Sequence, residues 1–187
     1  ALNQATWAGL NESEIVDIAV SSQRKCGCTI TGSMDDTWAS MSSGWKLVDP
    51  KKSALESIIS EGKIEDEIII FLILRGSRSN IIEINNFKEH SRIFERALDS
   101  ILNDSIFQAI STNGMAVAAA TEDDEAVRIC NKLIANGAIA AGITGSGPAI
   151  SIVSFIQDSE TIRKVLSNSG YEIIETNFID NHSLELI

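Results

Sequence analysis

Long apolar runs are missing from this sequence, and so is an excess of basic residues. The longest apolar run, Ile68 to Leu74, is too short to cross a bilayer and fits a buried strand instead. Basic residues number 15 against 26 acidic ones, which gives a net charge of -11. Nucleic-acid surfaces need clustered Lys and Arg, so this balance argues against them. We therefore expect a soluble protein that binds neither membranes nor nucleic acids.

Cysteine is scarce as well, with Cys26, Cys28 and Cys130 as its three occurrences. An odd count without framework spacing predicts reduced thiols and a cytoplasmic protein. Cys26 and Cys28 could supply half of a metal site, but no second Cys/His pair lies at ligand spacing, so we expect no metal site. Residues 1–8 lack a basic region followed by a long apolar one, so we expect no signal peptide.

The beginning of the chain has no initiator Met, and residues 1–8 read as the last turns of a helix. Gly9 and Asn11 then supply a stop signal and a new cap. From this pattern we expect the chain to be a C-terminal fragment of a longer protein.

The sequence of the first third of the chain predicts two helices and a strand. Helical spacing of Ile15, Ile18, Ala19 and Ser22 predicts a helix from about Glu14 to Lys25, capped by Ser13 or Asn11. A short helix capped by Asp35 or Asp36 and closed by Gly44 comes next, followed by a strand at Trp45–Val48. We interpret Lys51–Asp66 as a connector with a short helical pattern and as the domain boundary.

The remaining two thirds predict a buried strand, three helices, two strands joined by a glycine turn, a helix and a final strand. The strands fall at Glu67–Leu74, on both sides of the turn, and at Tyr171–Phe178, with a short last one at Leu184–Ile187. This order predicts an α+β plait, an antiparallel sheet with helices packed on one face.

Local signals set the expected limits of the helices. Asn86 with Glu89 predicts a capping box for the first of the three. The second is expected to begin at Asp104 and to be interrupted at Asn113–Gly114, where a polar residue and a glycine hint at a ligand or a helix end. Thr121 is expected to cap the third. Asp158 or Ser159 is expected to cap the helix after the turn.

The glycine turn consists of Thr144, Gly145, Ser146, Gly147 and Pro148. Small residues let a ligand approach the backbone, and successive N–H groups in such a turn can form an anion-binding nest. The alternative is a hairpin loop that needs glycine only for its φ angles. Local sequence leaves both interpretations open.

Two further groups of residues could carry chemistry. Asp35 and Asp36 stand beside a glycine and at a helix start, where one carboxylate could accept a proton from a substrate hydroxyl. They could equally be acidic residues favoured by the helix dipole. Arg75 and Arg78 follow the buried strand and could hold a carboxylate or phosphate, or simply be part of a solvated loop.

Two motifs in order, T-I-T-G-S-M-D-D-T-W-A-S and N-G-A-I-A-A-G-I-T-G-S-G-P-A, resemble the GHMP small-molecule kinases. The Asp-Asp pair looks more narrowly like the archaeal type of shikimate kinase. The resemblance covers essentially the whole chain. It implies ATP-dependent phosphorylation of the shikimate 3-hydroxyl, with Mg²⁺, on the way to aromatic amino acids. It also implies a ferredoxin-like C-terminal plait over residues 64–187 and the helical tail of a ribosomal S5-like domain over residues 1–63.

The same resemblance assigns roles to individual residues. Asp35 matches the catalytic aspartate, and Asp36 would bind nearby. The stretch from Gly142 through Thr144, Gly145, Ser146 and Gly147 matches the motif that lies against phosphates and substrate. The further candidates for substrate binding are Thr31, Asn113 and one of two arginines, Arg75 or Arg78, which would meet the substrate carboxylate.

The serine- and glycine-rich phosphate loop of these kinases has no counterpart here, and no G-x-x-x-x-G-K-S/T loop replaces it. We therefore expect the fragment to be inactive alone. Three other interpretations stay open: a GHMP kinase acting on homoserine or a mevalonate-type alcohol, a non-catalytic GHMP relative that binds a metabolite, and a plain plait domain. The sequence does not decide the oligomeric state, and a homodimer is kept as one option.

Overall fold

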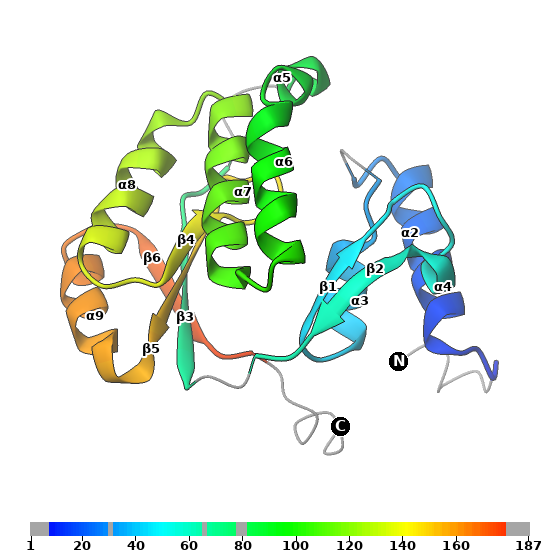
Figure 1. Ribbon diagram of the computed structural model, residues 1–187, viewed down its shortest axis with the longest axis horizontal. Coiled ribbons are helices and arrows are strands. Elements are labelled where there is room, and N and C mark those ends of the chain that lie inside the picture. Colours follow the sequence, from blue (N-terminus) through cyan, green and yellow to red (C-terminus); the bar gives the residue numbers. More distant parts are fainter. Residues whose placement is uncertain (1–7, 30–31, 65–66, 78–81, 179–187) are drawn as a thin grey trace. The chain divides into compact units, whose positions relative to one another are not determined.

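The computed structural model describes residues 8–29, 32–64, 67–77 and 82–178 (Figure 1). They form two compact units, each with its own hydrophobic core. The first contains the described residues up to 64 together with Phe178, and the second contains those from 67 to 177. Among the described residues, no helix is both long enough and apolar enough to cross a membrane.

The first unit opens with helix α2, Glu12–Lys25, which Asn11 caps. The Asn11 side chain accepts a hydrogen bond from the N–H of Glu14 at 3.0 Å, and the Glu14 carboxylate accepts one from the Asn11 N–H at 2.8 Å. This reciprocal capping box fixes the start of the helix. The predicted apolar face is wrong, because the buried residues are Val16 and Val20, whereas Ile18 is 54% exposed.

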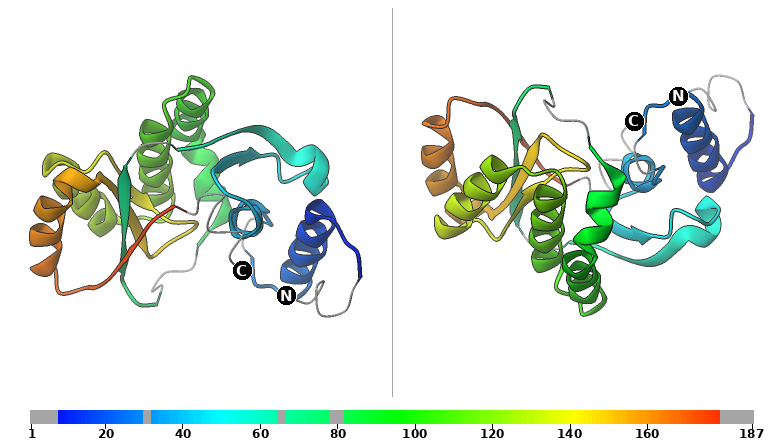
Figure 2. Two further views of the ribbon diagram at one scale, coloured as in Figure 1. Left: turned by 90° about the horizontal axis from the view of Figure 1, so that it is seen from below. Right: turned by 90° about the horizontal axis from the view of Figure 1, so that it is seen from above.

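Helix α3, Asp35–Met41, and strand β1, Trp45–Val48, follow. The predicted connector instead contains helix α4, Ala54–Ser57, and strand β2, Ile58–Gly62, which pairs antiparallel with β1. Figure 2 shows α2 beside α4 in both views. Val16, Met34, Trp38 and Ala54 bury their side chains together in the core of this unit.

The second unit is built on a four-stranded antiparallel sheet in the order β4-β5-β3-β6. Its strands are β3 (Ile68–Leu74), β4 (Ala140–Ile143), β5 (Ile150–Phe155) and β6 (Glu172–Thr176). The predicted plait is therefore confirmed. The last strand expected at Leu184–Ile187, like the helical end expected at residues 1–7, lies outside the described residues.

The helices of this unit are α5 (Ile84–Glu89), α6 (Ser91–Leu102), α7 (Ile106–Ala120), α8 (Asp124–Ala135) and α9 (Ser159–Ser167), with a 3-10 turn at Ile156–Asp158 before α9. Alternate residues of β3, namely Ile69, Phe71 and Ile73, pack with apolar residues of α8 and α9 to form the core. This is the arrangement expected of one buried sheet face.

Several predicted helix starts are wrong. Asn86 lies inside α5 and caps nothing, since α5 begins at Ile84 and α6 begins after His90. The side chain that caps α8 belongs to Asp123, which accepts from the Ala126 N–H at 2.9 Å, rather than to Thr121. Several polar residues that can cap a helix lie near each of these helix starts, so their sequence positions alone do not identify the one that caps it.

Helix α7 runs without the interruption predicted at Asn113–Gly114. Gly114 is buried and faces β4, where a Cβ on it would overlap the Cα of Gly142. In return, a Cβ on Gly142 would lie 2.9 Å from the Ile110 carbonyl oxygen. Both glycines are therefore required by close packing of α7 against the strand that enters the glycine turn.

Candidate functional site

The glycine turn joins β4 to β5 as a closed hairpin. The Thr144 N–H donates to the Ala149 carbonyl at 2.9 Å, and the Gly147 N–H donates to the Thr144 carbonyl at 2.9 Å. Gly145 and Gly147 have φ angles of +55° and +82°, which L side chains rarely adopt. The hairpin geometry alone therefore explains these two glycines.

The backbone around Gly145 is also open to a ligand. A Cβ added to Gly145 would meet no atom within 4 Å, and its N–H makes no hydrogen bond within the described part of the chain. Thr144 and Gly145 are both exposed. The turn can thus offer a backbone N–H donor to a ligand. Its geometry is compatible both with a hairpin loop and with an anion-binding turn.

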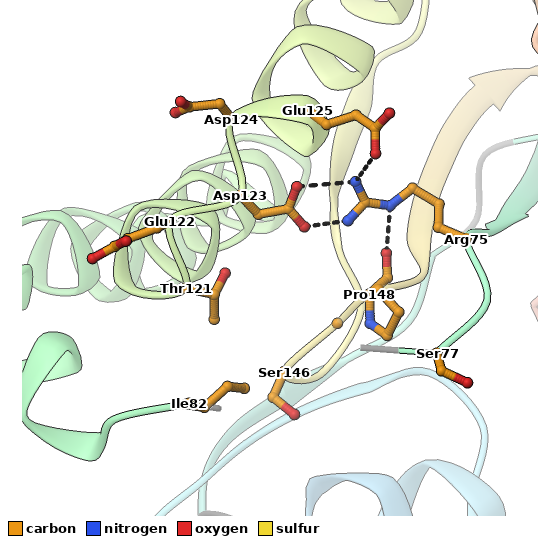
Figure 3. Close-up of a pocket in the computed structure, with 11 residues that line it drawn as sticks. Arg75, Ser77, Ile82, Thr121, Glu122, Asp123, Asp124, Glu125, Ser146 and Pro148 are labelled. Atoms are coloured by element: carbon orange, nitrogen blue, oxygen red, sulfur yellow. Dashed lines mark hydrogen bonds and ion pairs between the residues drawn. The ribbon is translucent and has the colours of Figure 1, made fainter. Parts of the chain in front are cut away.

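A cavity of about 310 Å³ opens on one side of the turn (Figure 3). Ser146, Gly147 and Pro148 of the turn form one wall, and the loop before α8 forms another. That loop and the first turn of α8 together contribute four consecutive acidic residues, Glu122 to Glu125. The remaining lining residues are Arg75, Ser77, Ile82 and Thr121.

Arg75 lies between the turn and the acidic loop. Its Nε donates to the Pro148 carbonyl at 2.8 Å. Its Nη1 donates to Asp123 Oδ1 at 3.0 Å and to Glu125 Oε2 at 3.1 Å, and its Nη2 pairs with Asp123 Oδ2. Figure 3 shows the guanidinium held by these three residues, while Glu122 and Asp124 point away from it. The Arg75 side chain is only 5% exposed.

The pairing shifts the titration of both partners. The hydrogen bond from Arg75 to Asp123 raises the pKa of Arg75, against the opposing effect of burial. Burial by itself would raise the pKa of Asp123, but the hydrogen bonds from Arg75 and from the Ala126 N–H outweigh it and lower that pKa. Both groups are therefore charged at neutral pH.

The charge on this side of the turn is unfavourable for phosphate. Among the described residues, four carboxylates line the cavity, and the Arg75 guanidinium that opposes them is already paired with two of them. A phosphate entering the cavity would be repelled by Glu122 and Asp124. Among the described residues, the exposed backbone at Gly145 lies outside this acidic lining.

Asp35 and Asp36 occupy the first turn of α3 in the other unit, and both are exposed. The prediction that one of them caps the helix is wrong, because Met34 holds the N-cap position without a side-chain hydrogen bond. Partial desolvation raises the pKa of Asp36, and the charge of Asp35 raises it further. Asp35 therefore affects the titration of Asp36 through its charge.

The other predicted site residues lie in different settings. Asn113 is an exposed residue of α7. Thr31 and Arg78 lie outside the described residues. Of the predicted set, Arg75 and the glycine turn come together. Asp35 belongs to the other unit, and its convergence with the turn stays a prediction.

Two residues that contact Arg75 were not predicted from the sequence, Asp123 and Glu125. Glu125 also accepts a hydrogen bond from the Tyr171 hydroxyl at 2.7 Å. The acidic run before α8 is visible in the sequence, but it reads as a helix start. Only the fold reveals that this run pairs with an arginine 48 residues earlier.

No group of three or more His, Cys, Asp or Glu side chains that could hold a metal ion occurs in the part of the chain that the structure describes. Cys26 and Cys28 are exposed and free, and Cys130 is buried and free. Burial raises the pKa of the Cys130 thiol to about 11, so this thiol is protonated at neutral pH.

Known proteins resemble this chain over most of its length. The shikimate kinase of Methanobrevibacter smithii is 28% identical over 95% of this chain, and that of Aeropyrum pernix is 26% identical over 83% of it. These alignments cover 60% and 54% of the two relatives, so the chain spans less than two thirds of their length.

Solved structures share the fold at lower identity. Mevalonate kinase from Methanococcus jannaschii superimposes with a TM-score of 0.60 at 13% identity, over 91% of this chain and 57% of that one. Homoserine kinase from Cytophaga hutchinsonii gives a TM-score of 0.58 at 13% identity, over 95% and 61%. Residues 87–171 match the family model for the C-terminal region of GHMP kinases. The chain therefore has the GHMP kinase fold, and this segment is a GHMP kinase C-terminal domain.

Proposed function

We propose that the complete protein is a kinase that transfers the γ-phosphoryl group of ATP to the 3-hydroxyl of shikimate. The observation that carries the proposal is similarity to archaeal shikimate kinases over up to 95% of the chain. The two motifs of the chain, the Asp-Asp pair and the glycine turn, occur in the order that the resemblance requires. Because the chain spans only part of its relatives, the activity is proposed for the complete protein.

Asp35 is proposed as the residue that orients the acceptor hydroxyl and accepts its proton. A general base must reach its substrate, and Asp35 is an exposed residue at the start of α3. Asp36 is proposed to bind the substrate beside it. Phosphoryl transfer depends mainly on positioning and charge stabilisation, so a single well-placed carboxylate is sufficient as the acceptor of the proton.

The glycine turn is proposed to lie against the nucleotide phosphates. The open space over Gly145 and its available N–H fit a phosphate oxygen, which needs a donor and close approach to the backbone. ATP supplies the phosphoryl group, and Mg²⁺ neutralises its charge. The ion would be held by the phosphates and at most one or two carboxylates, since the described residues offer no larger ligand group.

The substrate carboxylate needs a donor that is not already committed. Arg75 is paired within the protein, so we propose Arg78 for this contact, together with Thr31 and Asn113 for the hydroxyl groups. Arg78 and Thr31 enter the proposal through charge, hydrogen-bonding type and motif position. The three free cysteines fit a reducing compartment, so we place the reaction in the cytoplasm.

The decisive experiment measures ADP release by the complete protein with ATP, Mg²⁺ and one acceptor at a time: shikimate, homoserine or mevalonate. We expect turnover with shikimate. The Asp35→Asn variant should lower kcat by about 100-fold or more while the KM for shikimate changes little. Glu12→Gln is the matched control, because Glu12 is an exposed carboxylate in the first turn of another helix.

Other outcomes point to the alternative functions. Turnover with homoserine or mevalonate but not shikimate would assign the protein to another GHMP kinase activity. Binding of a metabolite without turnover, unaffected by Asp35→Asn, would favour a non-catalytic relative. Either result contradicts the shikimate kinase proposal.

A further inference from the structure

We propose that Arg75 is a positioning residue of this kinase, which together with Asp123 holds the glycine turn in place for the nucleotide. The inference rests on the proposed function, and it gives Arg75 a role different from that of a substrate ligand. It is carried by the contacts of one guanidinium with two separate segments of the second unit, Pro148 of the glycine turn and Asp123 with Glu125 at the start of α8.

The first step is the contact with the turn. Arg75 Nε donates to the carbonyl of Pro148, the residue that follows Gly147. The opposite side of the turn is already fixed by the hydrogen bond from Thr144 to Ala149. Glycine residues on both sides of Ser146 allow the backbone more conformations than other residues would, so a contact from outside the hairpin restricts it further. Arg75 supplies that contact at the last residue of the turn.

The second step is that Arg75 is itself held. Asp123 accepts two hydrogen bonds from the guanidinium, and its Oδ1 also accepts from the Ala126 N–H at 2.9 Å. Asp123 is thereby fixed to the first turn of α8. Glu125 adds a contact and accepts from Tyr171, just before β6. The turn is thus connected through Arg75 to a helix packed into the core.

The third step concerns what remains for a substrate. An arginine side chain has five N–H donors, and the contacts with Pro148, Asp123 and Glu125 use four of them. Two carboxylates offset its single positive charge. A group that is 5% exposed and paired in this way attracts an anionic substrate weakly.

The test uses Arg75→Gln, Asp123→Asn and the double variant in the complete protein. Asn at 123 keeps an oxygen to cap α8, so the main loss is the charged pair with Arg75. Each single variant should lower kcat about 10- to 100-fold through misplacement of the turn, with little change in the KM for shikimate. The double variant should be no worse than either single one, because both remove the same support.

The matched control is Arg163→Gln. Arg163 also pairs with two carboxylates, Glu160 and Glu175, but it contacts no residue of the turn among the described residues. It should leave kcat and KM near their original values. Arg75→Lys, which preserves charge and most of the volume, replaces Arg75→Gln if the latter does not fold.

Two results would overturn the inference. A raised KM for shikimate in Arg75→Gln, combined with an unchanged or lower KM in Asp123→Asn, would show that Arg75 binds the substrate carboxylate. Independent, multiplying losses in the double variant would show that the two residues do not act together.

A second readout does not depend on catalysis. Hydrogen exchange of the Thr144 and Gly147 amides in the ligand-free protein should be faster in Arg75→Gln and Asp123→Asn, and unchanged in Arg163→Gln. Equal exchange in all four proteins contradicts the inference. Absence of turnover in the unmodified protein contradicts the proposed function instead, and the exchange data then still decide whether Arg75 holds the turn.

Discussion

Arg75 and Arg163 make the same kind of contact in two different places. Each guanidinium pairs with two carboxylates of the second unit. Arg75 is 5% exposed and reaches residues 48, 50 and 73 positions away in the sequence. Arg163 is 37% exposed and reaches Glu160 in its own helix and Glu175 on β6.

The burial and location of an ion pair therefore decide how much its loss destabilises the protein, more than the number of its hydrogen bonds does. An exposed pair is screened by water and salt, and its loss leaves two groups that water solvates. A buried pair leaves an uncompensated charge when one partner is removed. Arg75 also joins the glycine turn to the start of α8, so its loss should affect the local order of the turn.

The largest expected effect is on stability. Arg75→Gln should lower the free energy of unfolding by roughly 3 kcal/mol, because Asp123 is left partly buried without its counterion. Arg163→Gln should have a much smaller effect. Urea denaturation of both variants and the unmodified protein measures the difference. Equal decreases in the free energy of unfolding of the two variants would contradict the idea that the buried pair contributes more to stability than the exposed one.

Cys130 provides a probe of the region around Arg75. The thiol is 7% exposed with a pKa of about 11, so it reacts with thiol reagents only when the structure opens. Arg75→Gln should accelerate its labelling at pH 7 about tenfold or more, since each 1.4 kcal/mol lost from the opening free energy gives a factor of ten.

Cys26 and Cys28 are exposed and serve as internal references for the reagent. Mass spectrometry of digested protein separates the three cysteines. A Cys130 labelling rate that is the same in Arg75→Gln and Arg163→Gln would contradict the idea that only the buried pair restrains this region.

Lowering the pH should reduce the difference in the free energy of unfolding between Arg75→Gln and the unmodified protein. The pKa of Asp123 is lower in the folded state, so its contribution is present above its unfolded value of about 4 and is lost as the pH falls through the folded value. We expect the stability gap between the unmodified protein and Arg75→Gln to be constant from about pH 5 to 7 and to narrow below pH 4. A gap that widens in acid would assign the effect to another group.

The smallest expected effect is the change in stability of the two variants when the salt concentration is raised. Raising ionic strength from about 0.01 M to 1 M shortens the Debye length from about 30 Å to 3 Å and screens exposed pairs more than buried ones. The slight destabilisation by Arg163→Gln should therefore disappear in 1 M NaCl, whereas most of that by Arg75→Gln should persist. Thermal unfolding at both salt concentrations measures this, and equal salt sensitivity of the two variants would contradict it.

The elements that the sequence predicted well are those whose signal is local and continuous. The run Ile68–Leu74 predicts a strand because it is β-branched and uniformly apolar, and the runs on both sides of the glycine turn predict a hairpin. Strand β2 was missed because Leu55, Ile58 and Ile59 also fit helical spacing. In the structure Leu55 is 77% exposed, and the helix ends at Ser57.

The parts that could not be predicted depend on tertiary contacts. Gly114 reads as a helix breaker from propensity alone, but its reason is the backbone of Gly142, 28 positions later. The glycine turn and the Asp-Asp pair were recognisable as motifs, whereas the partners of Arg75 were not, since no spacing rule links an arginine after a strand to an acidic run before a distant helix.

The contact between Gly114 and Gly142 has a consequence for movement. Sliding α7 along β4 by about one helical turn would bring Ile110 or Ala118 to the point where no Cβ fits. The Ser111 hydroxyl, which accepts from the Ala141 N–H at 3.2 Å, would lose its partner at the same time. The position of helix α7 along strand β4 is therefore fixed by this close packing and this hydrogen bond. Any displacement of the glycine turn must either carry α7 with it or bend the chain after Ile143.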